Sequence, residues 1–129
     1  MVHHDVLRQS VLILTGVIFT FYACWTLFRP HSLARILGYQ LNNHNAKSEF
    51  HAIYIGVFLA QAVLCVFAGL HIEQVLLGDL VAIFVLSQPV GRIVALFRNG
   101  FPKRQLRLIT ITEIVGGILL LLIRPSLAL

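Results

Sequence analysis

Charged residues are scarce in this chain, and acids are the scarcest of them. Only 12% of its 129 residues are charged, and five Asp or Glu stand against ten Lys or Arg. Soluble domains usually carry about 25% charged residues, whereas 58% of the residues here are hydrophobic. This composition argues against an ordinary soluble domain and is typical of a membrane protein. The basic residues adjoin apolar stretches, so no nucleic-acid partner is expected.

Cysteine and catalytic motifs are also sparse. The only thiols are Cys24 and Cys65, which are not spaced as a Cys-x-x-Cys redox motif. We expect them at opposite depths of the membrane, too far apart for a disulfide, which needs Cα atoms within about 7 Å. The chain also lacks a nucleophile elbow, a phosphate loop and a dinucleotide motif. The sequence therefore names no cofactor and leaves open whether the protein is an enzyme.

The six histidines do not form a metal-binding pattern. His3 and His4 adjoin each other near the N-terminus, whereas His31, His44 and His51 are expected on the other side of the membrane. No His-x-x-x-His or Glu-x-x-His spacing occurs on one expected helix. We therefore predict no metal site.

Four long apolar segments are present, at about residues 11–28, 50–70, 75–97 and 106–123. Each is close to the roughly 20 residues that a helix needs to cross a bilayer. They lack the alternation of barrel strands, which recurs in segments of about 10 residues. No small-x-small cleavage site follows the first segment, so we interpret it as a span rather than a signal peptide. The sequence predicts an all-α fold, a transmembrane four-helix bundle in a single domain, residues 1–129.

A short amphipathic helix is expected at the membrane interface, between the first two spans. Pro30 should end the first span, Ser32 is a suitable N-cap and Gly38 is a suitable stop. The apolar face of this helix would consist of Leu33, Ile36 and Leu37. The alternative is a simple loop packed under the bundle.

Two ionisable residues lie well inside the expected spans, Arg92 in the third and Glu113 in the fourth. Such residues cost roughly 2.5–3.5 kcal/mol at the bilayer centre and tend to face the bundle interior in pairs. At about 1.5 Å rise per residue, both lie roughly 9 Å from the cytoplasmic ends of their helices. Gln88 is one turn from Arg92, and Glu49 opens the second span on the same side. We predict a ligand-binding or ion-pair cluster of Glu49, Gln88, Arg92 and Glu113, with His51, Tyr54 and Gln61 in the pocket wall.

This cluster has two interpretations. A buried ion pair can fix helix register without any further function. Acids inside a membrane also mark ligand cavities and proton paths. The sequence leaves both open.

Two other features are expected to be structural. Asp79 lies about one turn inside the outer end of the third span, near His71 and Glu73, where its side chain should reach the surface. Gly56 and Ala60 are four residues apart on the second span, a spacing that lets helices approach closely. We expect them to pack within the bundle rather than against a second copy.

Several segments together resemble a known family. They are residues 29–38 (RPHSLARILG), 49–56 (EFHAIYIG) and 91–96 (GRIVAL), followed by Glu113 in the last span. The pattern resembles a family of small bacterial four-helix membrane proteins described as a domain of unknown function, and is similar to the wider DoxX-like group. This resemblance implies a four-helix bundle in a bacterial inner membrane. It implies no reaction, because none of these segments is a catalytic signature.

A binding function is the one that the sequence favours. We expect a polytopic inner-membrane protein that binds a lipid-like or quinone-like molecule, or that serves as an accessory subunit of a membrane enzyme complex. Arg92 would hold an anionic or carbonyl head, positioned by Glu49 and Glu113. The alternatives are a membrane-embedded isomerase-type enzyme with Glu113 as acid or base, and a proton-coupled transporter acting as an oligomer. The expected partners are membrane lipids, with a larger membrane complex or further copies of the chain in the subunit and transporter hypotheses.

The basic residues predict the orientation of the chain. Seven fall in or beside the first and third loops, against two on the other side. The seven are Arg29, Arg35, Lys47, Arg98, Lys103, Arg104 and Arg107, and the two are Arg8 and Arg124. Because basic loops stay in the cytoplasm, both termini should lie on the non-cytoplasmic side.

Cysteine labelling tests this orientation. With Cys24 and Cys65 replaced, Gln74→Cys should react with an impermeant thiol reagent added to intact cells, whereas His44→Cys should react only after the membrane is permeabilised. Labelling of position 44 from outside would reverse the orientation.

Overall fold

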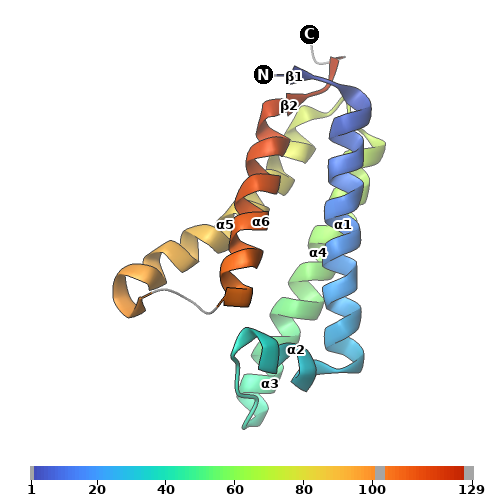
Figure 1. Cartoon of the computed structure of the whole chain (residues 1–129). Helices are drawn as coiled ribbons and strands as arrows, with labels where there is room; N and C mark the ends of the chain where they lie inside the picture. Colours follow the sequence, from blue (N-terminus) through green and yellow to red (C-terminus); the bar gives the residue numbers. More distant parts are fainter. Residues whose placement is uncertain (1, 101–103, 127–129) are drawn as a thin grey trace.

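The computed structural model describes residues 2–100 and 104–126, and it is mostly helical (Figure 1). Lys103, which was counted in the orientation argument, lies outside the described residues. The elements follow one another as β1 (Val2–His3), α1 (Asp5–Phe28), α2 (Pro30–Leu37), α3 (His44–His51), the π-helical segment η1 (Ala52–Val57), α4 (Phe58–Leu70), α5 (Val75–Asn99), α6 (Arg104–Leu122) and β2 (Ile123–Arg124).

Four helices are long and apolar enough to cross a membrane, judged by length and composition: Asp5–Phe28, His44–Leu70, Val75–Asn99 and Arg104–Leu122. The second of them is continuous through α3, η1 and α4. The first two begin earlier than their apolar segments because polar side chains cap them. His4 Nδ1 accepts from the Leu7 amide at 3.0 Å, and Asn43 Oδ1 accepts from the Ala46 amide at 2.8 Å.

A short parallel strand pair departs from the predicted all-α fold. Val2 pairs with Ile123 and His3 with Arg124, which brings the two ends of the chain side by side (Figure 1). Each strand has two residues, too few to show the side-chain alternation that marks a strand in a sequence.

Small residues bring α1 and α4 close together. A Cβ added to Gly16 would lie 3.0 Å from Cys65 Cβ and 3.5 Å from the Ala62 carbonyl oxygen. The prediction that Gly56 and Ala60 pack within the bundle was wrong, because both are exposed, and a Cβ on Gly56 would meet nothing within 4 Å. Two small residues four apart do favour close helix packing, but these two lie outside the buried face of their helix.

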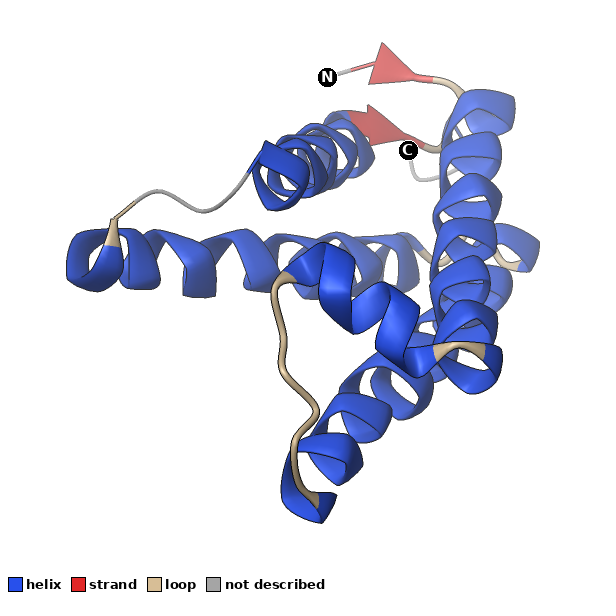
Figure 2. Cartoon of the chain, turned by 60° about the horizontal axis from the view of Figure 1, so that its bottom comes forward, coloured by secondary structure: helices blue, strands red, loops and turns tan. Residues whose placement is uncertain are grey.

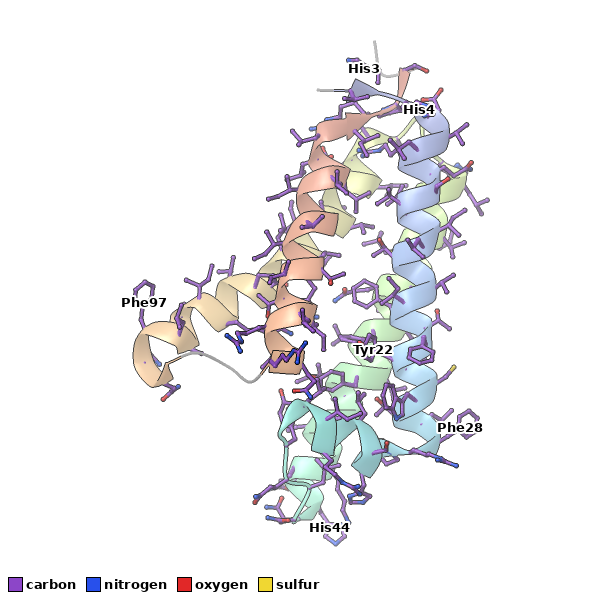
Figure 3. The ribbon with its side chains drawn as sticks, viewed as in Figure 1. His3, His4, Tyr22, Phe28, His44 and Phe97 are labelled. Carbon is purple, nitrogen blue, oxygen red and sulfur yellow. The ribbon has the colours of Figure 1, made fainter. Side chains whose placement is uncertain are left out.

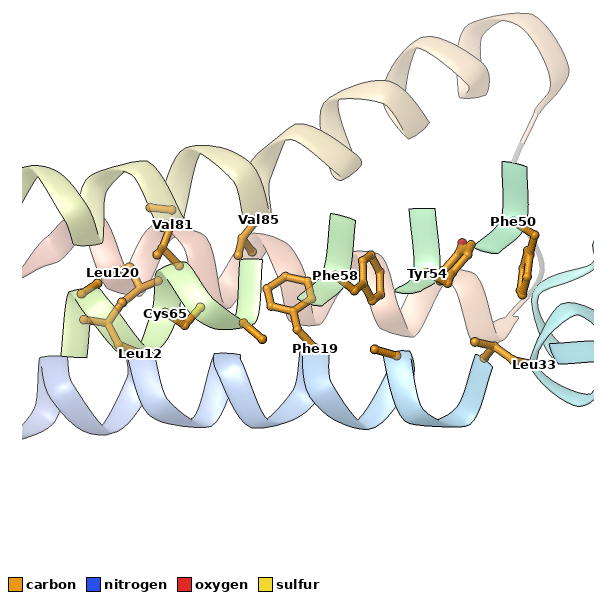
Figure 4. Packing of buried hydrophobic residues seen from close by; sticks show 14 of the residues in the cluster. Leu12, Phe19, Leu33, Phe50, Tyr54, Phe58, Cys65, Val81, Val85 and Leu120 are labelled. Carbon is orange, nitrogen blue, oxygen red and sulfur yellow. The ribbon is translucent and has the colours of Figure 1, made fainter. Parts of the chain in front are cut away.

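The core changes character along its length (Figure 4). Near the termini it consists of aliphatic and small side chains, including Leu12, Cys65 and Leu120. Toward the other end it becomes a row of aromatic rings, in which Phe58 lies 5.0 Å from both Phe19 and Tyr54 between ring centroids. Cys65 is buried, Cys24 is exposed, and both thiols are free.

Helix α5 leaves the other helices in its second half. Beyond Val85 it turns away from them (Figures 1 and 4). Pro89 lies inside the helix at this point, and proline removes a backbone hydrogen bond and bends helices. Val90 and Phe97 are consequently 59% and 85% exposed. The helices therefore pack closely at the end that holds the termini and more openly at the other.

Helix α2 lies across the open end, between the end of α1 and the loop that leads to α3 (Figure 2). As predicted, Gly38 ends it in the left-handed conformation, with φ of 84°. The predicted N-cap at Ser32 was wrong, because the helix already begins at Pro30, whose fixed φ suits the first helical position. Ile36, expected on the apolar face, is 42% exposed, whereas Leu33 is buried.

An ion network joins the helices at the end that holds the termini. Arg124 Nη1 donates to both carboxylate oxygens of Asp79, at 2.6 and 2.7 Å, and Arg8 Nη2 lies 3.4 Å from one of them. The Arg8 side chain is only 1% exposed. Its guanidinium also donates to the carbonyl oxygens of Val75, Leu120 and Ile123 at 3.1, 2.6 and 2.6 Å.

The expectation for Asp79 was therefore wrong. Its side chain does not lie free at the surface, because two guanidinium groups supply the partners that water would otherwise provide. His71 and Glu73, its expected neighbours, instead lie beside each other, with His71 Nδ1 3.5 Å from a Glu73 carboxylate oxygen.

Gly78 makes room for this network. A Cβ at position 78 would lie 2.3 Å from Arg8 Nη2 and 2.9 Å from Arg8 Cζ. Only glycine lets the guanidinium pass at this distance from the α5 backbone.

We expect Gly78→Ala to lower the free energy of unfolding in detergent by about 1–3 kcal/mol, because the added methyl group displaces Arg8 from its carbonyl partners. Gly91→Ala on the same helix is the matched control, since its Cβ meets nothing within 4 Å. The control should be neutral or stabilising by about 0.5–1 kcal/mol. Equal effects of the two substitutions would show that Arg8 is not held against α5.

Candidate functional site

The predicted pairing of Arg92 with Glu113 is present in the structure. Arg92 Nη1 donates to the Glu113 carboxylate and, at 3.0 Å, to Thr110 Oγ1. Arg92 Nη2 donates to Gln88 Oε1 at 3.2 Å. The Arg92 and Glu113 side chains are 19% and 16% exposed. The guanidinium is thus held by three side chains, of which Thr110 was not predicted.

Helix periodicity and close packing position these groups. Gln88 and Arg92 are four residues apart on α5, and Thr110 and Glu113 are three apart on α6, so each pair shares one helix face. Thr110 donates its own hydroxyl to the Leu106 carbonyl at 2.7 Å, which leaves its oxygen free to accept from Arg92.

Helices α5 and α6 pack closely beside this cluster. A Cβ added to Gly117 would lie 2.5 Å from Leu86 Cγ. The small residue at position 117 therefore lets the two helices approach, and their polar faces meet.

The ion pair lines a cavity of about 840 Å³. This volume falls in the range of about 300–1,000 Å³ that is typical of small-molecule sites. Its lining residues come from α1, α2, η1, α4, α5 and α6: Val11, Leu14, Thr15, Val17, Ile18, Phe19, Phe21, Tyr22, Leu37, Tyr54, Phe58, Val85, Gln88, Arg92, Leu108, Ile109, Ile111, Thr112, Glu113, Val115, Gly116 and Leu119. Figure 3 draws the side chains of this region, with Tyr22 labelled on α1.

The cavity opens sideways, between α1 and α6. Several of its lining residues on these two helices are also exposed on the outside of the molecule, among them Leu14 (60%), Phe21 (59%) and Ile111 (57%). Most of these exposed residues are apolar, and Thr112 on α6 is an exposed polar exception. A molecule that entered here would therefore pass through a mostly apolar mouth before it reached the ion pair.

The structure brings together four of the residues predicted for the site. Gln88, Arg92 and Glu113 form the polar cluster, and Tyr54 lines the same cavity. Tyr54 is held in η1, and π-helical segments inside α-helices occur frequently at functional sites. Nothing in the sequence analysis indicated this π-helix.

The other three predicted residues lie elsewhere. Glu49 is exposed and lines a separate cavity of about 200 Å³ beside Tyr39. It makes no ion pair in the part of the chain that the structure describes. His51 Nδ1 lies 2.6 Å from the Lys47 carbonyl oxygen on its own helix. Gln61 is buried but lines neither cavity, and its carbonyl oxygen has no hydrogen-bond partner among the described residues.

The placement of Glu49 has a geometric cause. The prediction used depth along the helix and did not consider direction around it. Glu49 lies on α3, and Tyr54 follows in the π-helical segment η1, where the count of 3.6 residues per turn no longer holds. Tyr54 lines both cavities, whereas Glu49 lines only the smaller one.

The histidines are divided between the two ends of the molecule. His3 and His4 lie at one end and His44 at the opposite end (Figure 3). Among residues 2–100 and 104–126, no group of three or more His, Cys, Asp or Glu side chains is arranged to hold a metal ion.

Fold and site together define a class: a small helical protein with four membrane-length apolar helices and a cavity lined by a mostly buried Arg–Glu pair. The chain belongs to the family described as "Domain of unknown function (DUF4345)", whose sequence profile matches residues 7–124. The match supports the unknown-function family suggested by the sequence and gives no link to the DoxX-like group. Comparisons with curated proteins and with solved structures gave no match.

A double-mutant cycle tests the coupling of Arg92 and Glu113. Arg92→Leu should destabilise the protein by about 3 kcal/mol, because it leaves a mostly buried carboxylate without its cation. Arg92→Leu combined with Glu113→Leu should recover much of that loss. Both are measured as free energies of unfolding in detergent.

The control for this cycle is Arg98→Leu, which removes an exposed guanidinium from the same helix and should have little effect. Strictly additive losses for Arg92 and Glu113 would mean that the two side chains do not stabilise each other.

Proposed function

We propose that this protein is an integral membrane protein that takes a lipid-like or quinone-like molecule from the bilayer and holds it in the cavity between α1 and α6. The observation that carries the proposal is the combination, in one cavity, of a mostly apolar mouth and a polar cluster. The mouth is formed mainly by exposed apolar residues such as Leu14 and Ile111, and the cluster by Gln88, Arg92 and Glu113.

The position of the opening supports uptake from the membrane. If α1 and α6 cross the bilayer, the mouth between them faces hydrocarbon rather than water. A hydrocarbon chain can then leave the bilayer without exposure to water, and only the polar head needs new partners. Arg92 and Gln88 can supply those partners. Ionisable groups inside membrane proteins commonly mark such sites.

The membrane assignment has its own support. Four helices have the required length and hydropathy, and the basic residues cluster beside the first and third loops. We place the chain in a bacterial inner membrane with both termini on the non-cytoplasmic side. The same cavity would serve an accessory subunit that presents a bound molecule to a larger membrane enzyme.

Binding is favoured over the two alternative functions by the geometry of the site. Glu113 is engaged by Arg92, whereas a general acid or base of an isomerase must exchange its proton freely. A proton-coupled transporter needs access from both faces of the membrane, whereas this cavity has its mouth at the side.

The proposal predicts that the protein purified in gentle detergent carries a bound amphiphile, detectable by native mass spectrometry and by extraction. Gly116→Phe should reduce its occupancy by about tenfold or more, because Gly116 lines the cavity and has open space at its Cβ. The added ring would then occupy the volume of the ligand.

Gly91→Phe is the matched control, since Gly91 also has open space but does not line the cavity. It should leave the occupancy unchanged. Equal occupancy in the two variants, or wild-type protein that carries no amphiphile, would contradict the proposal.

A further inference from the structure

Resting on the proposed function, we infer that the bound molecule has an uncharged head with a hydroxyl or carbonyl oxygen, attached to a hydrocarbon chain. This goes beyond the proposal that an amphiphile binds, because membranes contain anionic, cationic and neutral amphiphiles. The inference comes from the charge balance and the free hydrogen-bonding groups of the cavity.

The charges on the described residues that line the cavity cancel. Among these residues, only Arg92 and Glu113 carry a charge, and they form an ion pair with each other. A carboxylate or phosphate head would have to compete with Glu113 for the guanidinium, and an ammonium head would have to compete with Arg92 for the carboxylate. Either would leave one unpaired charge in an apolar surrounding, which is strongly unfavourable. A neutral head leaves the pair intact.

The polar cluster of Gln88, Arg92 and Glu113 still offers hydrogen bonds of both kinds. Gln88 uses its oxygen to accept from Arg92, so its amide N–H groups remain available as donors. Glu113 accepts from Arg92 through Oε2, and within the described residues its Oε1 has no partner. Tyr22 and Tyr54 also line this cavity. A hydroxyl can use both donors and acceptors, and a carbonyl oxygen can use the donors.

Beyond this cluster and the two tyrosines, the described lining holds two more polar side chains, Thr15 and Thr112. They donate their hydroxyls to backbone carbonyls of their own helices, to Val11 at 2.7 Å and to Leu108 at 2.9 Å. Their oxygens can still accept a hydrogen bond, but they offer no further donor. The remaining described lining is apolar and suited to hydrocarbon, so the main polar contacts of the ligand lie at the ion pair.

The test compares three probes that share an oleyl chain and differ in the head: oleyl alcohol, oleate and oleyltrimethylammonium. Their binding to the purified full-length protein at pH 8 is measured by native mass spectrometry and by the shift in unfolding temperature. Oleyl alcohol should bind about tenfold or more tightly than either charged probe.

Charge variants then reverse this preference. Glu113→Gln leaves Arg92 without its counter-ion, so oleate should gain about tenfold relative to the alcohol. Arg92→Gln leaves Glu113 unpaired, so oleyltrimethylammonium should gain instead. Glu49→Gln and Arg98→Gln make the same changes in net charge at exposed positions outside this cavity. They should keep the wild-type ranking.

The outcomes separate this inference from the proposed function. A wild-type protein that binds oleate or oleyltrimethylammonium best overturns the neutral head but keeps amphiphile binding. A preference for the alcohol that neither charge variant changes overturns the role of the ion pair, and with it the inference. If no probe binds the wild type or its variants, the proposed function fails as well. If a charge variant does not fold, the wild-type ranking decides.

Discussion

A buried guanidinium must be surrounded by acceptors, and this requirement organises both ends of the molecule. Arg8 meets it with three backbone carbonyls and Asp79, and Arg92 meets it with Gln88, Thr110 and Glu113. An uncompensated charge in an apolar interior costs several kcal/mol, so the helices that supply these acceptors are fixed relative to one another.

The two arginines nevertheless serve different purposes. Arg8 is enclosed at the tightly packed end, where Gly78 leaves room for its guanidinium. Arg124 binds the same Asp79 carboxylate as Arg8 does. Arg8 lines neither of the two cavities described above and is only 1% exposed, so we interpret its role as joining the helices. Arg92 lies at the open end, at the wall of a large cavity and with partners that are only partly used. The same chemistry thus produces a structural joint at one end and a candidate binding site at the other.

The sequence predicted the features that depend on hydropathy and on position along a helix. It missed those that depend on the direction in which a side chain points around its helix. The four apolar helices and the pairing of Arg92 with Glu113 followed from segment length and a common rise per residue. Glu49 was misplaced because the direction of a side chain around its helix was not considered, and it lines only the smaller cavity. Asp79 was misjudged because its partners, Arg8 and Arg124, are distant in sequence. The π-helix around Tyr54 had no recognisable sequence signal.

The departure of α5 from the other helices has a consequence for local stability. Its second half packs against few neighbours, so it should open at a lower free energy than the rest of the chain, as sparsely packed segments do. Arg92 is on this segment and bonds it to α6 through Thr110 and Glu113. Local unfolding of this half of α5 would therefore break the contacts of Arg92 with α6 before it disturbs the core. Conversely, a molecule that occupied the cavity would slow the hydrogen exchange of the backbone amides of α5 beyond Pro89. This segment lies far from both ends of the chain (Figure 1).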